Sequence, residues 1–284
     1  MTDPIRLGIF GFPVVHSKSP EMHRAAARAL GIALEYDRFE VAPADLAAEV
    51  TRKHDEGIDG YNLTVPHKET VMALLDDVAP GARAIRAVNT VVRTDDGYVG
   101  HNTDAPGLVR SLEEAGVGVG EARVIVLGAG GAARAAVVGL AEAGASEIAV
   151  LARRPEQGEA LVESLVEALA DHVECTVEAA PLSEADWHFD SATLVVQATS
   201  ATLESNPRAD EFAAMLPIDA LPPDAAVVDM VYKPLKTSVL ARAEERGLKI
   251  VDGLGMLLYQ GAIAFEMWTG SAPPIDVMRE ALRN

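Results

Sequence analysis

The stretch that decides the fold is VLGAGGAAR, residues 126–134. It continues an apolar run, residues 123–127, that predicts a buried strand, and it leads into an alanine-rich run, residues 132–143, that predicts a helix. A strand, a tight glycine turn and a helix N-terminus form a phosphate-binding corner, because glycine lets a pyrophosphate approach the backbone and the helix start offers free N–H groups. The glycine spacing is that of a dinucleotide-binding unit.

More than 120 residues precede this corner, so a separate unit comes first. Around the corner, strands and helices alternate, which predicts a parallel sheet covered by helices on both faces. The expected strands after the corner are residues 147–151, 194–198, 226–230 and 248–251, and the expected helices are 156–171 and 237–246. Upstream we expect strands at 7–12, 34–41 and 60–65, a hairpin of 88–93 with 98–100, and helices at 20–30, 44–56, from Pro66 and from Asp104 to 115.

Helix 20–30 is expected to have Ser19 as its N-cap and Pro20 at its first position. The chain after residue 254 is helical again. These last helices have no place in a minimal nucleotide fold, so we expect them to pack on the first unit. The fold class is therefore α/β with two domains, the second a doubly wound Rossmann-type domain.

Composition narrows the classes of function. The 284 residues carry 43 acidic and 24 basic side chains, a net charge of −19, which argues against nucleic acid or an anionic membrane as the main partner. The single cysteine, Cys175, excludes an intrachain disulfide and a cysteine-rich zinc site, and we expect no metal. The N-terminus lacks a signal-peptide pattern, and the apolar stretch 254–268 is shorter than the ~20 residues that span a bilayer. The single cysteine fits a reducing cytosol, so we expect a cytoplasmic protein, and we leave open whether it forms a homodimer.

The strand that follows the corner ends in Ala152-Arg153-Arg154, where NAD-binding units carry an acidic residue for the ribose. Two guanidinium groups in that place favour a 2′-phosphate and hence NADP. The alternative is that both arginines are ordinary exposed residues at a helix start.

Three upstream segments place polar groups at the ends of predicted elements: residues 16–20 (HSKSP), residues 62–68 (NLTVPHK) and the pair 88–90 (VNT) with 102–104 (NTD). Helix capping accounts for Ser19 and for Asp104, but it leaves Ser17 unexplained. A lysine in the first turn of a helix is opposed by the macrodipole, which argues against a stability role for Lys68; its other interpretation is a solvated surface lysine. Together the segments suit the binding of a small polyhydroxylated acid and the transfer of one proton.

These segments, the glycine corner and the C-terminal run Asp252-Gly253-Leu254-Gly255-Met256 with Tyr259-Gln260-Gly261-Ala262 resemble the motifs of shikimate dehydrogenases. The resemblance covers residues 5–270. It implies a substrate domain of residues 1–104 plus 254–284 and an NADP domain of residues 105–253. It also implies reversible NADP-dependent reduction of 3-dehydroshikimate to shikimate, on the pathway to aromatic amino acids.

The resemblance further implies roles for single residues. Lys68 is the implied acid and base, with Asp104 as its partner. The residues implied to bind substrate are Ser17, Ser19, Asn62, Thr64, Asn89, Asp104, Tyr232 and Gln260. The residues implied to bind the cofactor are Gly128, Ala129, Gly130, Gly131, Ala132, Arg153, Arg154, Thr199, Met230 and Gly253.

The chain departs from the family pattern in two places. The usual Asn-Arg-Thr of the phosphate grip is Ala152-Arg153-Arg154 here. The usual Asn-x-Thr is Gln197-Ala198-Thr199, and a frequent glycine three residues after that threonine is Thr202, so we expect loop 199–212 to differ locally. Two alternatives remain: a quinate/shikimate dehydrogenase with dual substrate or NAD use, and a non-catalytic NADP-binding regulatory protein, which predicts loss of the lysine–aspartate pair.

Overall fold

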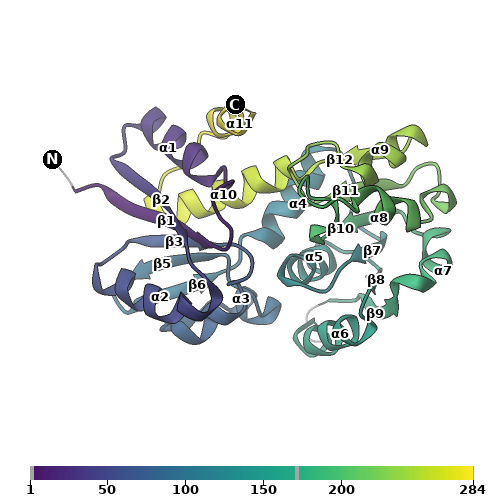
Figure 1. Cartoon of the computed structure of the whole chain (residues 1–284), viewed down its shortest axis with the longest axis horizontal. Helices are drawn as coiled ribbons and strands as arrows, with labels where there is room; N and C mark the ends of the chain where they lie inside the picture. Colours follow the sequence, from purple (N-terminus) through teal and green to yellow (C-terminus); the bar gives the residue numbers. More distant parts are fainter. Residues whose placement is uncertain (1–2, 170–172, 284) are drawn as a thin grey trace. The chain divides into compact units, whose positions relative to one another are not determined.

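A computed structural model describes residues 3–169 and 173–283 of the chain. The chain divides into two compact units (Figure 1). Unit 1 comprises residues 1–103 and 258–284, and unit 2 comprises residues 104–257.

Unit 2 is built on a six-stranded sheet within the described part of the chain, in the order β12-β11-β10-β7-β8-β9. Every pairing in it is parallel. Read from the other edge, this is the strand order of a dinucleotide-binding fold, with its reversal point between β7 and β10. The strands are β7 (Arg123–Leu127), β8 (Glu147–Ala152), β9 (Thr176–Pro181), β10 (Leu194–Gln197), β11 (Ala226–Asp229) and β12 (Lys249–Val251).

The central strands of unit 2 are apolar because both of their faces are covered. All four residues of β10 and of β11 are buried, as are four of the five in β7. Such runs are typical of parallel sheets with helices on both sides. The helices of this unit are α4 (Asp104–Glu114), α5 (Gly131–Glu142), α6 (Pro155–Leu169), α7 (Asp186–Phe189), α8 (Ala209–Met215) and α9 (Ser238–Glu245).

Unit 1 has a mixed sheet in the order β2-β1-β3-β5-β6-β4. Strand β1 pairs in parallel with β2 and β3, whereas β5 runs antiparallel to both β3 and β6. The turn between β5 and β6 reaches Gly97, whose φ of +120° lies in the region that favours glycine. The strands are β1 (Ile5–Gly11), β2 (Leu34–Glu40), β3 (Gly60–Leu63), β4 (Asp77–Val78), β5 (Thr90–Thr94) and β6 (Gly97–His101).

Helices α1 (Ser19–Leu30), α2 (Leu46–Asp55), α3 (Pro80–Ile85) and α11 (Ile275–Arg283) belong to unit 1, and α10 (Gly253–Thr269) crosses the boundary between the units. Helix α11 packs on α1. Trp268, near the end of α10, donates from its indole nitrogen to the carbonyl oxygen of Val91 in β5 at 2.9 Å. The prediction that the C-terminal helices return to the first unit is confirmed, as is the two-domain α/β fold class.

Two local predictions were wrong. Helix α1 begins at Ser19, so Lys18 and not Ser19 is its N-cap residue, and the hydroxyl of Ser17 accepts the N–H of Ser19 at 3.3 Å. Pro66 opens no helix: residues 65–69 are mainly turns, followed by a 3-10 helix, Thr70–Leu74. The carbonyl oxygen of Lys68 accepts instead from Val88 N–H at 2.8 Å, so the dipole argument for this lysine does not apply.

Several elements were missed. Strand β9 is a half-exposed edge strand that ends in a proline, so it lacks the apolar run that marks its neighbours. The short β4, α3, α7 and α8 lack the length that a periodic pattern needs. Helix 156–171 is matched by α6, which is described to Leu169; residues 170–171 lie outside the described part.

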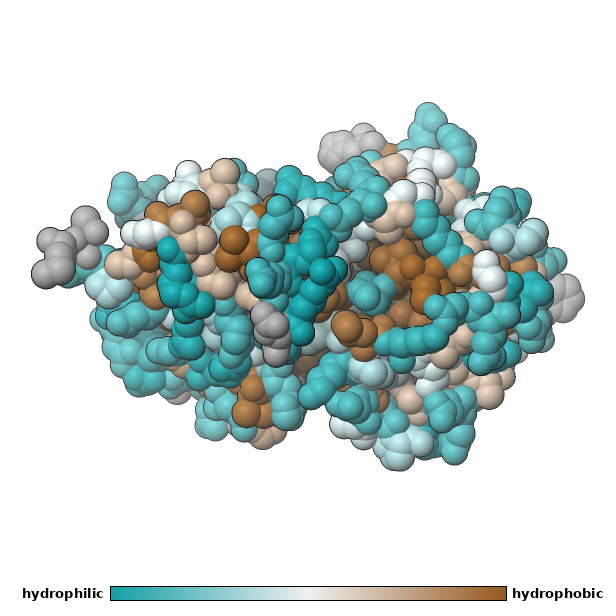
Figure 2. Space-filling view, turned by 90° about the horizontal axis from the view of Figure 1, so that it is seen from above, coloured by the Kyte–Doolittle hydropathy of each residue, from teal (hydrophilic) through white to brown (hydrophobic). Residues whose placement is uncertain are grey.

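Figure 2 shows mostly hydrophilic side chains on the face it presents, with smaller hydrophobic areas between them, which agrees with the large number of charged residues in the sequence. Among the described residues, no helix is both long and apolar enough to cross a bilayer.

Candidate active site

The glycine corner of unit 2 has the geometry that its sequence predicts. Gly128 directly follows β7 with a φ of +118°, and a Cβ atom built on it would lie 2.7 Å from Cγ2 of Thr199. Gly130 is the N-cap residue of α5, and no side chain among the described residues caps this helix end. A Cβ on Gly130 would meet no atom within 4 Å. The corner therefore offers open space in front of unused helix N–H groups, which fits a phosphate.

This corner lies where the strand order reverses. Gly128 follows β7 and Thr199 follows β10, and these two strands are neighbours at the centre of the sheet. The strands after β7 continue toward one edge of the sheet, and those after β10 continue toward the other. Ligands of open parallel sheets bind at the carboxyl ends of the strands at such a point. The close contact between Gly128 and Thr199 places two of the predicted cofactor residues side by side.

Arg153 and Arg154 follow β8, the next strand, and both are exposed ahead of α6. In a dinucleotide-binding unit this strand end faces the adenosine ribose. Exposed guanidinium groups there fit a 2′-phosphate by charge and by bidentate geometry.

Met230 and Gly253, two further predicted cofactor residues, are in contact within unit 2. A Cβ on Gly253 would lie 2.5 Å from the carbonyl oxygen of Met230, so only glycine fits there. Met230 follows β11, and its N–H donates to the carbonyl oxygen of Gln197 at 2.9 Å. Both residues therefore belong to the same edge of the sheet as Thr199.

In unit 1, Ser17 and Ser19 lie at the N-terminus of α1. Ser19 is buried and Ser17 is partly exposed. The guanidinium group of Arg38 donates twice to the carbonyl oxygen of Ser17, at 2.6 and 3.2 Å, and also to the carboxylate of Glu21. Two hydroxyls at a helix start, with a guanidinium behind them, suit the binding of a carboxylate.

A buried hydrogen-bond network joins most of the predicted substrate residues of unit 1. The side chain of Asn62 accepts from the hydroxyl of Tyr36 at 2.6 Å and donates to the carbonyl oxygen of Asn89 at 3.0 Å. The side chain of Asn89 donates in turn to Oε1 of Gln260 at 3.4 Å. Ser19 also hydrogen-bonds Tyr36. The structure thus connects Ser19, Asn62, Asn89 and Gln260, which are far apart in the sequence.

Three members of this network were missed from the sequence. Tyr36, Thr90 and Thr103 are all completely buried. Thr90 accepts from Nδ2 of Asn62 at 3.0 Å, and Thr103 donates its N–H to Oδ1 of Asn89 at 2.7 Å. The two threonines belong to motifs that the sequence analysis names. Each directly follows an asparagine of its motif, and this position could have marked them as members of the network. Tyr36 is in the middle of a strand, where nothing in the sequence marked it.

Lys68 lies in a turn that is fixed on both sides. Its carbonyl oxygen accepts from Val88 N–H at 2.8 Å, one residue before Asn89. The preceding His67 is buried and donates from Nε2 to the carbonyl oxygen of Val41 at 2.8 Å. Burial lowers the pKa of His67, which keeps its ring neutral. The backbone of Lys68 is thereby held next to the asparagine network, while its side chain is only partly buried.

Thr64 is part of the same loop. Its N–H donates to the carbonyl oxygen of Phe10 at 2.9 Å, and its Cγ2 fills the space where a Cβ of Gly11 would lie. Asp104 and Tyr232 belong to unit 2. Asp104 is buried, is the first residue of α4, and directly follows Thr103 of the network.

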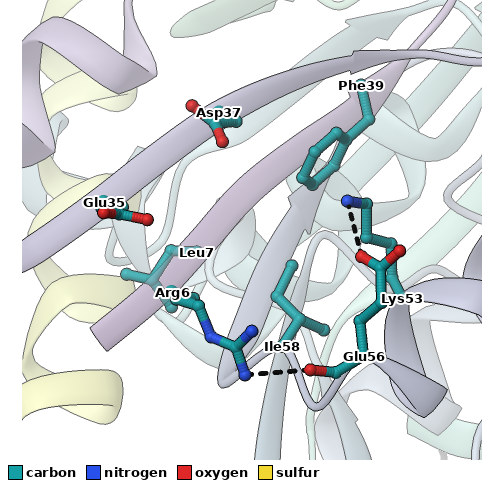
Figure 3. A pocket seen from close by; sticks show the side chains of 8 residues that line it. All are labelled: Arg6, Leu7, Glu35, Asp37, Phe39, Lys53, Glu56 and Ile58. Atoms are coloured by element: carbon teal, nitrogen blue, oxygen red, sulfur yellow. Dashed lines mark hydrogen bonds and ion pairs between the residues drawn. The ribbon is translucent and has the colours of Figure 1, made fainter. Parts of the chain in front are cut away.

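A small pocket of about 90 Å³ in unit 1 is lined by none of the predicted site residues (Figure 3). Both of its cationic side chains are already bound to Glu56. Arg6 donates to the carbonyl oxygen of Glu56 at 2.9 Å, and Lys53 forms an ion pair with the Glu56 carboxylate at 3.0 Å. We assign this pocket no role in the chemistry.

Comparison with known proteins covers nearly the whole chain. Residues 9–91 match the family description "Shikimate dehydrogenase substrate binding domain", residues 111–215 match "Shikimate / quinate 5-dehydrogenase", and residues 253–283 match "Shikimate 5'-dehydrogenase C-terminal domain". The NADP(+) shikimate dehydrogenase of Moorella thermoacetica is 44% identical over 279 residues, which cover 98% of this chain and 92% of that protein.

Solved structures agree with this match. The crystal structure of shikimate 5-dehydrogenase from Thermus thermophilus with NADP(H) and shikimate has a TM-score of 0.84 and 38% identity, and 98% of each chain is covered. The quinate dehydrogenase of Corynebacterium glutamicum with NAD has a TM-score of 0.88 and 31% identity, and 99% of each chain is covered.

Proposed function

The chain belongs to the shikimate dehydrogenase family, and we propose that it interconverts 3-dehydroshikimate and shikimate with Lys68 as the acid and base. It is an oxidoreductase that uses NADP and serves the synthesis of aromatic amino acids. The observation that carries this function is the match to a curated NADP-dependent enzyme at 44% identity over 98% of the chain.

The residues of unit 2 fit NADP by shape and charge. Open space before the uncapped start of α5 suits the pyrophosphate, and the exposed Arg153 and Arg154 suit the 2′-phosphate. When bound, NADPH supplies the hydride. Thr199, Met230 and Gly253 are the residues that we propose to lie beside its nicotinamide end.

In unit 1, we propose that Ser17 and Ser19 bind the carboxylate of the substrate at the start of α1. Asn62, Thr64, Asn89 and Gln260 offer amide and hydroxyl groups to the substrate hydroxyls. The network that holds Asn62, Asn89 and Gln260 fixes the directions of these three side chains before substrate arrives, which lowers the entropic cost of binding. Tyr232 and Asp104 are the proposed contributions of unit 2 to the same substrate.

The proton is assigned to Lys68. During reduction, negative charge develops on the ketone oxygen, and an ammonium group beside it stabilises this charge and then donates a proton. The backbone of Lys68 is held by the two hydrogen bonds described above, which limits the region that its amine can reach. The carboxylate of Asp104, the proposed partner, favours the charged form of an amine near it.

Substrate and cofactor choice are tested together. Quinate is assayed as a second substrate because the quinate dehydrogenase described above shares the fold over 99% of the chain. We expect the highest kcat/KM for shikimate with NADP among the four pairs of shikimate or quinate with NADP or NAD. A kcat/KM for quinate with NAD equal to that for shikimate with NADP would make the chain a dual-specificity enzyme.

The non-catalytic alternative is set aside, because the matched relatives are enzymes and both Lys68 and Asp104 are present. We further propose that unit 1 is the substrate domain and unit 2 the NADP domain, with boundaries near residues 104 and 254. A cytoplasmic location and a homodimer complete the proposal. Light scattering tests the dimer, for which the expected mass is twice 29.9 kDa.

A further inference from the structure

Gln197, the last residue of β10, and Thr202, in the loop that follows it, are hydrogen-bonded to each other. Both are completely or almost completely buried, at 0% and 1% exposure. Nε2 of Gln197 donates to Oγ1 of Thr202 at 2.8 Å. The two residues are five positions apart, and the loop between them carries Thr199.

Gln197 also holds the backbone of Thr199 on both sides. Its Oε1 accepts the N–H of Thr199 at 2.6 Å, and its Nε2 lies 2.9 Å from the carbonyl oxygen of the same residue. The hydroxyl of Thr199 accepts the N–H of Ala201 at 3.0 Å. One buried amide thus determines where Thr199 lies, and Thr199 is the residue that contacts Gly128.

The third member of the cluster is Asp229, a carboxyl group with 0% exposure at the end of β11. It accepts from Nε2 of Gln197 at 3.2 Å, from Val231 N–H at 2.9 Å and from the hydroxyl of Thr237 at 2.7 Å. Thr202 hydrogen-bonds the same carboxyl group. Burial raises the pKa of Asp229, and these hydrogen bonds oppose that effect.

The cluster reaches both loops at the carboxyl edge of the sheet. Through Gln197 it fixes the loop of Thr199, and through Val231 N–H it fixes the loop that carries Met230 and Tyr232. All three side chains are buried, and each is hydrogen-bonded to another member of the cluster.

We propose that Gln197, Thr202 and Asp229 act together as positioning residues of the nucleotide site, with Thr202 as the hydrogen-bond partner that holds the Gln197 amide. The hydroxyl of Thr202 accepts an N–H of this amide and is itself hydrogen-bonded to Asp229. This inference rests on the assignment of Gly128 and Thr199 to the NADP site.

The test is the dissociation constant of NADPH for the full chain, measured by calorimetry without substrate. Thr202→Val removes the hydroxyl and keeps the volume, and we expect it to weaken NADPH binding about tenfold, the effect of one buried hydrogen bond. Thr202→Ser restores the hydroxyl and should restore binding. The matched control is Thr193→Val: Thr193 precedes the other end of β10 and bonds the backbone N–H of Arg123.

Loss of stability alone does not produce this pattern. We expect both Thr202→Val and Thr193→Val to lower the unfolding temperature without ligand, but only Thr202→Val to weaken NADPH binding. Should Thr202→Val fail to fold, Gln197→Met, which removes the amide and keeps the length, takes its place. Unchanged NADPH affinity in the folded variant overturns the inference. Absence of NADPH binding by the unmodified chain would instead overturn the proposed function.

Discussion

The hydroxyl of Tyr36 donates a 2.6 Å hydrogen bond to Oδ1 of Asn62, and both side chains are buried. Burial raises the pKa of Tyr36, so the hydroxyl stays protonated and remains a donor. This bond holds the oxygen of the Asn62 amide toward Tyr36. The NH2 group of the amide therefore points toward Asn89 and Thr90, to which it donates.

Tyr36→Phe should raise the KM for shikimate several-fold and leave the dissociation constant of NADPH unchanged, because the amide of Asn62 loses the bond that orients it. We expect a loss of about 1–3 kcal/mol in the free energy of unfolding, the usual cost of a buried polar atom left unpaired. Tyr98→Phe is the matched control. The hydroxyl of Tyr98 donates to the carbonyl oxygen of Ile58 at 2.9 Å in the same unit, and its loss should cost stability but not substrate affinity. Equal KM values for the two variants would contradict the assignment.

Removing the guanidinium group of Arg153 should reduce the preference for NADPH over NADH. A charge-assisted hydrogen bond contributes about 1.5–3 kcal/mol, so Arg153→Ala should lower kcat/KM with NADPH about 10- to 100-fold and leave kcat/KM with NADH nearly constant. Arg154→Ala tests whether the second arginine shares this role. Arg208→Ala is the control, because Arg208 is an exposed arginine of unit 2 that is paired with Glu211. An Arg153→Ala variant with an unaltered NADPH/NADH ratio would place the phosphate elsewhere.

Gly130→Ala should weaken NADPH binding by about tenfold or more, with little effect on stability. A Cβ at Gly130 meets no protein atom within 4 Å, so the added methyl group can collide only with a bound ligand. Gly118→Ala is the control, since a Cβ there also meets no atom within 4 Å and the residue lies in a loop of the same unit. Calorimetric titration with NADPH distinguishes the two. Equal affinity of both variants would mean that the phosphates do not approach the start of α5.

His23 should make the protein sensitive to acid. Its ring is fully buried, stacks on Tyr36 at 4.7 Å and has no hydrogen-bond partner among the described residues. Burial lowers its pKa to about 3. Between pH ~6.5 and about pH 3, this ring is protonated in the unfolded chain but neutral in the folded chain. The free energy of unfolding therefore falls as the pH falls through this range, by up to about 1.4 kcal/mol per pH unit.

His23→Phe removes this ionisation while keeping an aromatic ring. Denaturant unfolding between pH 8 and pH 4 should show a shallower loss of stability for the variant than for the unmodified chain. The measurement at pH 8 is the internal control, since His23 is neutral there in both states and any difference reflects packing alone. Parallel curves over the whole range would show that His23 does not contribute to acid unfolding.

The sequence predicted the parts of the fold that have strong periodic or glycine signals. The buried strands β7, β8, β10 and β11, and helix α5, appear where the apolar runs and the VLGAGGAAR stretch indicate. The edge strand β9 was missed because an exposed strand with a terminal proline shows no alternation. Pro66 was misread as a helix start because proline suits a turn as well as a first helical position, and the carbonyl oxygen of Lys68 pairs with Val88, which is distant in the sequence.

The candidate site divides in the same way. Residues inside contiguous motifs, such as Asn62 and Asn89, could be predicted, but their joining into one network through Tyr36 could not. Tyr36 lies on β2 and Asn62 on β3, with β1 between them, so their hydrogen bond depends on the register of two parallel pairings, β1 with β2 and β1 with β3. The hydrogen bonds that join Gln197, Thr202 and Asp229 could not be predicted from the sequence either, because Asp229 is 32 positions from Gln197 and lies on a neighbouring strand.

The most direct test of the central claim is the rate of NADPH formation from shikimate and NADP, followed at the absorbance band of reduced nicotinamide, for the unmodified chain and for Lys68→Met. Loss of the acid–base group should lower kcat about 10²- to 10⁴-fold while the dissociation constant of NADPH stays unchanged. A Lys68→Met variant with the kcat of the unmodified chain would contradict the account, because the proton would then move through another group.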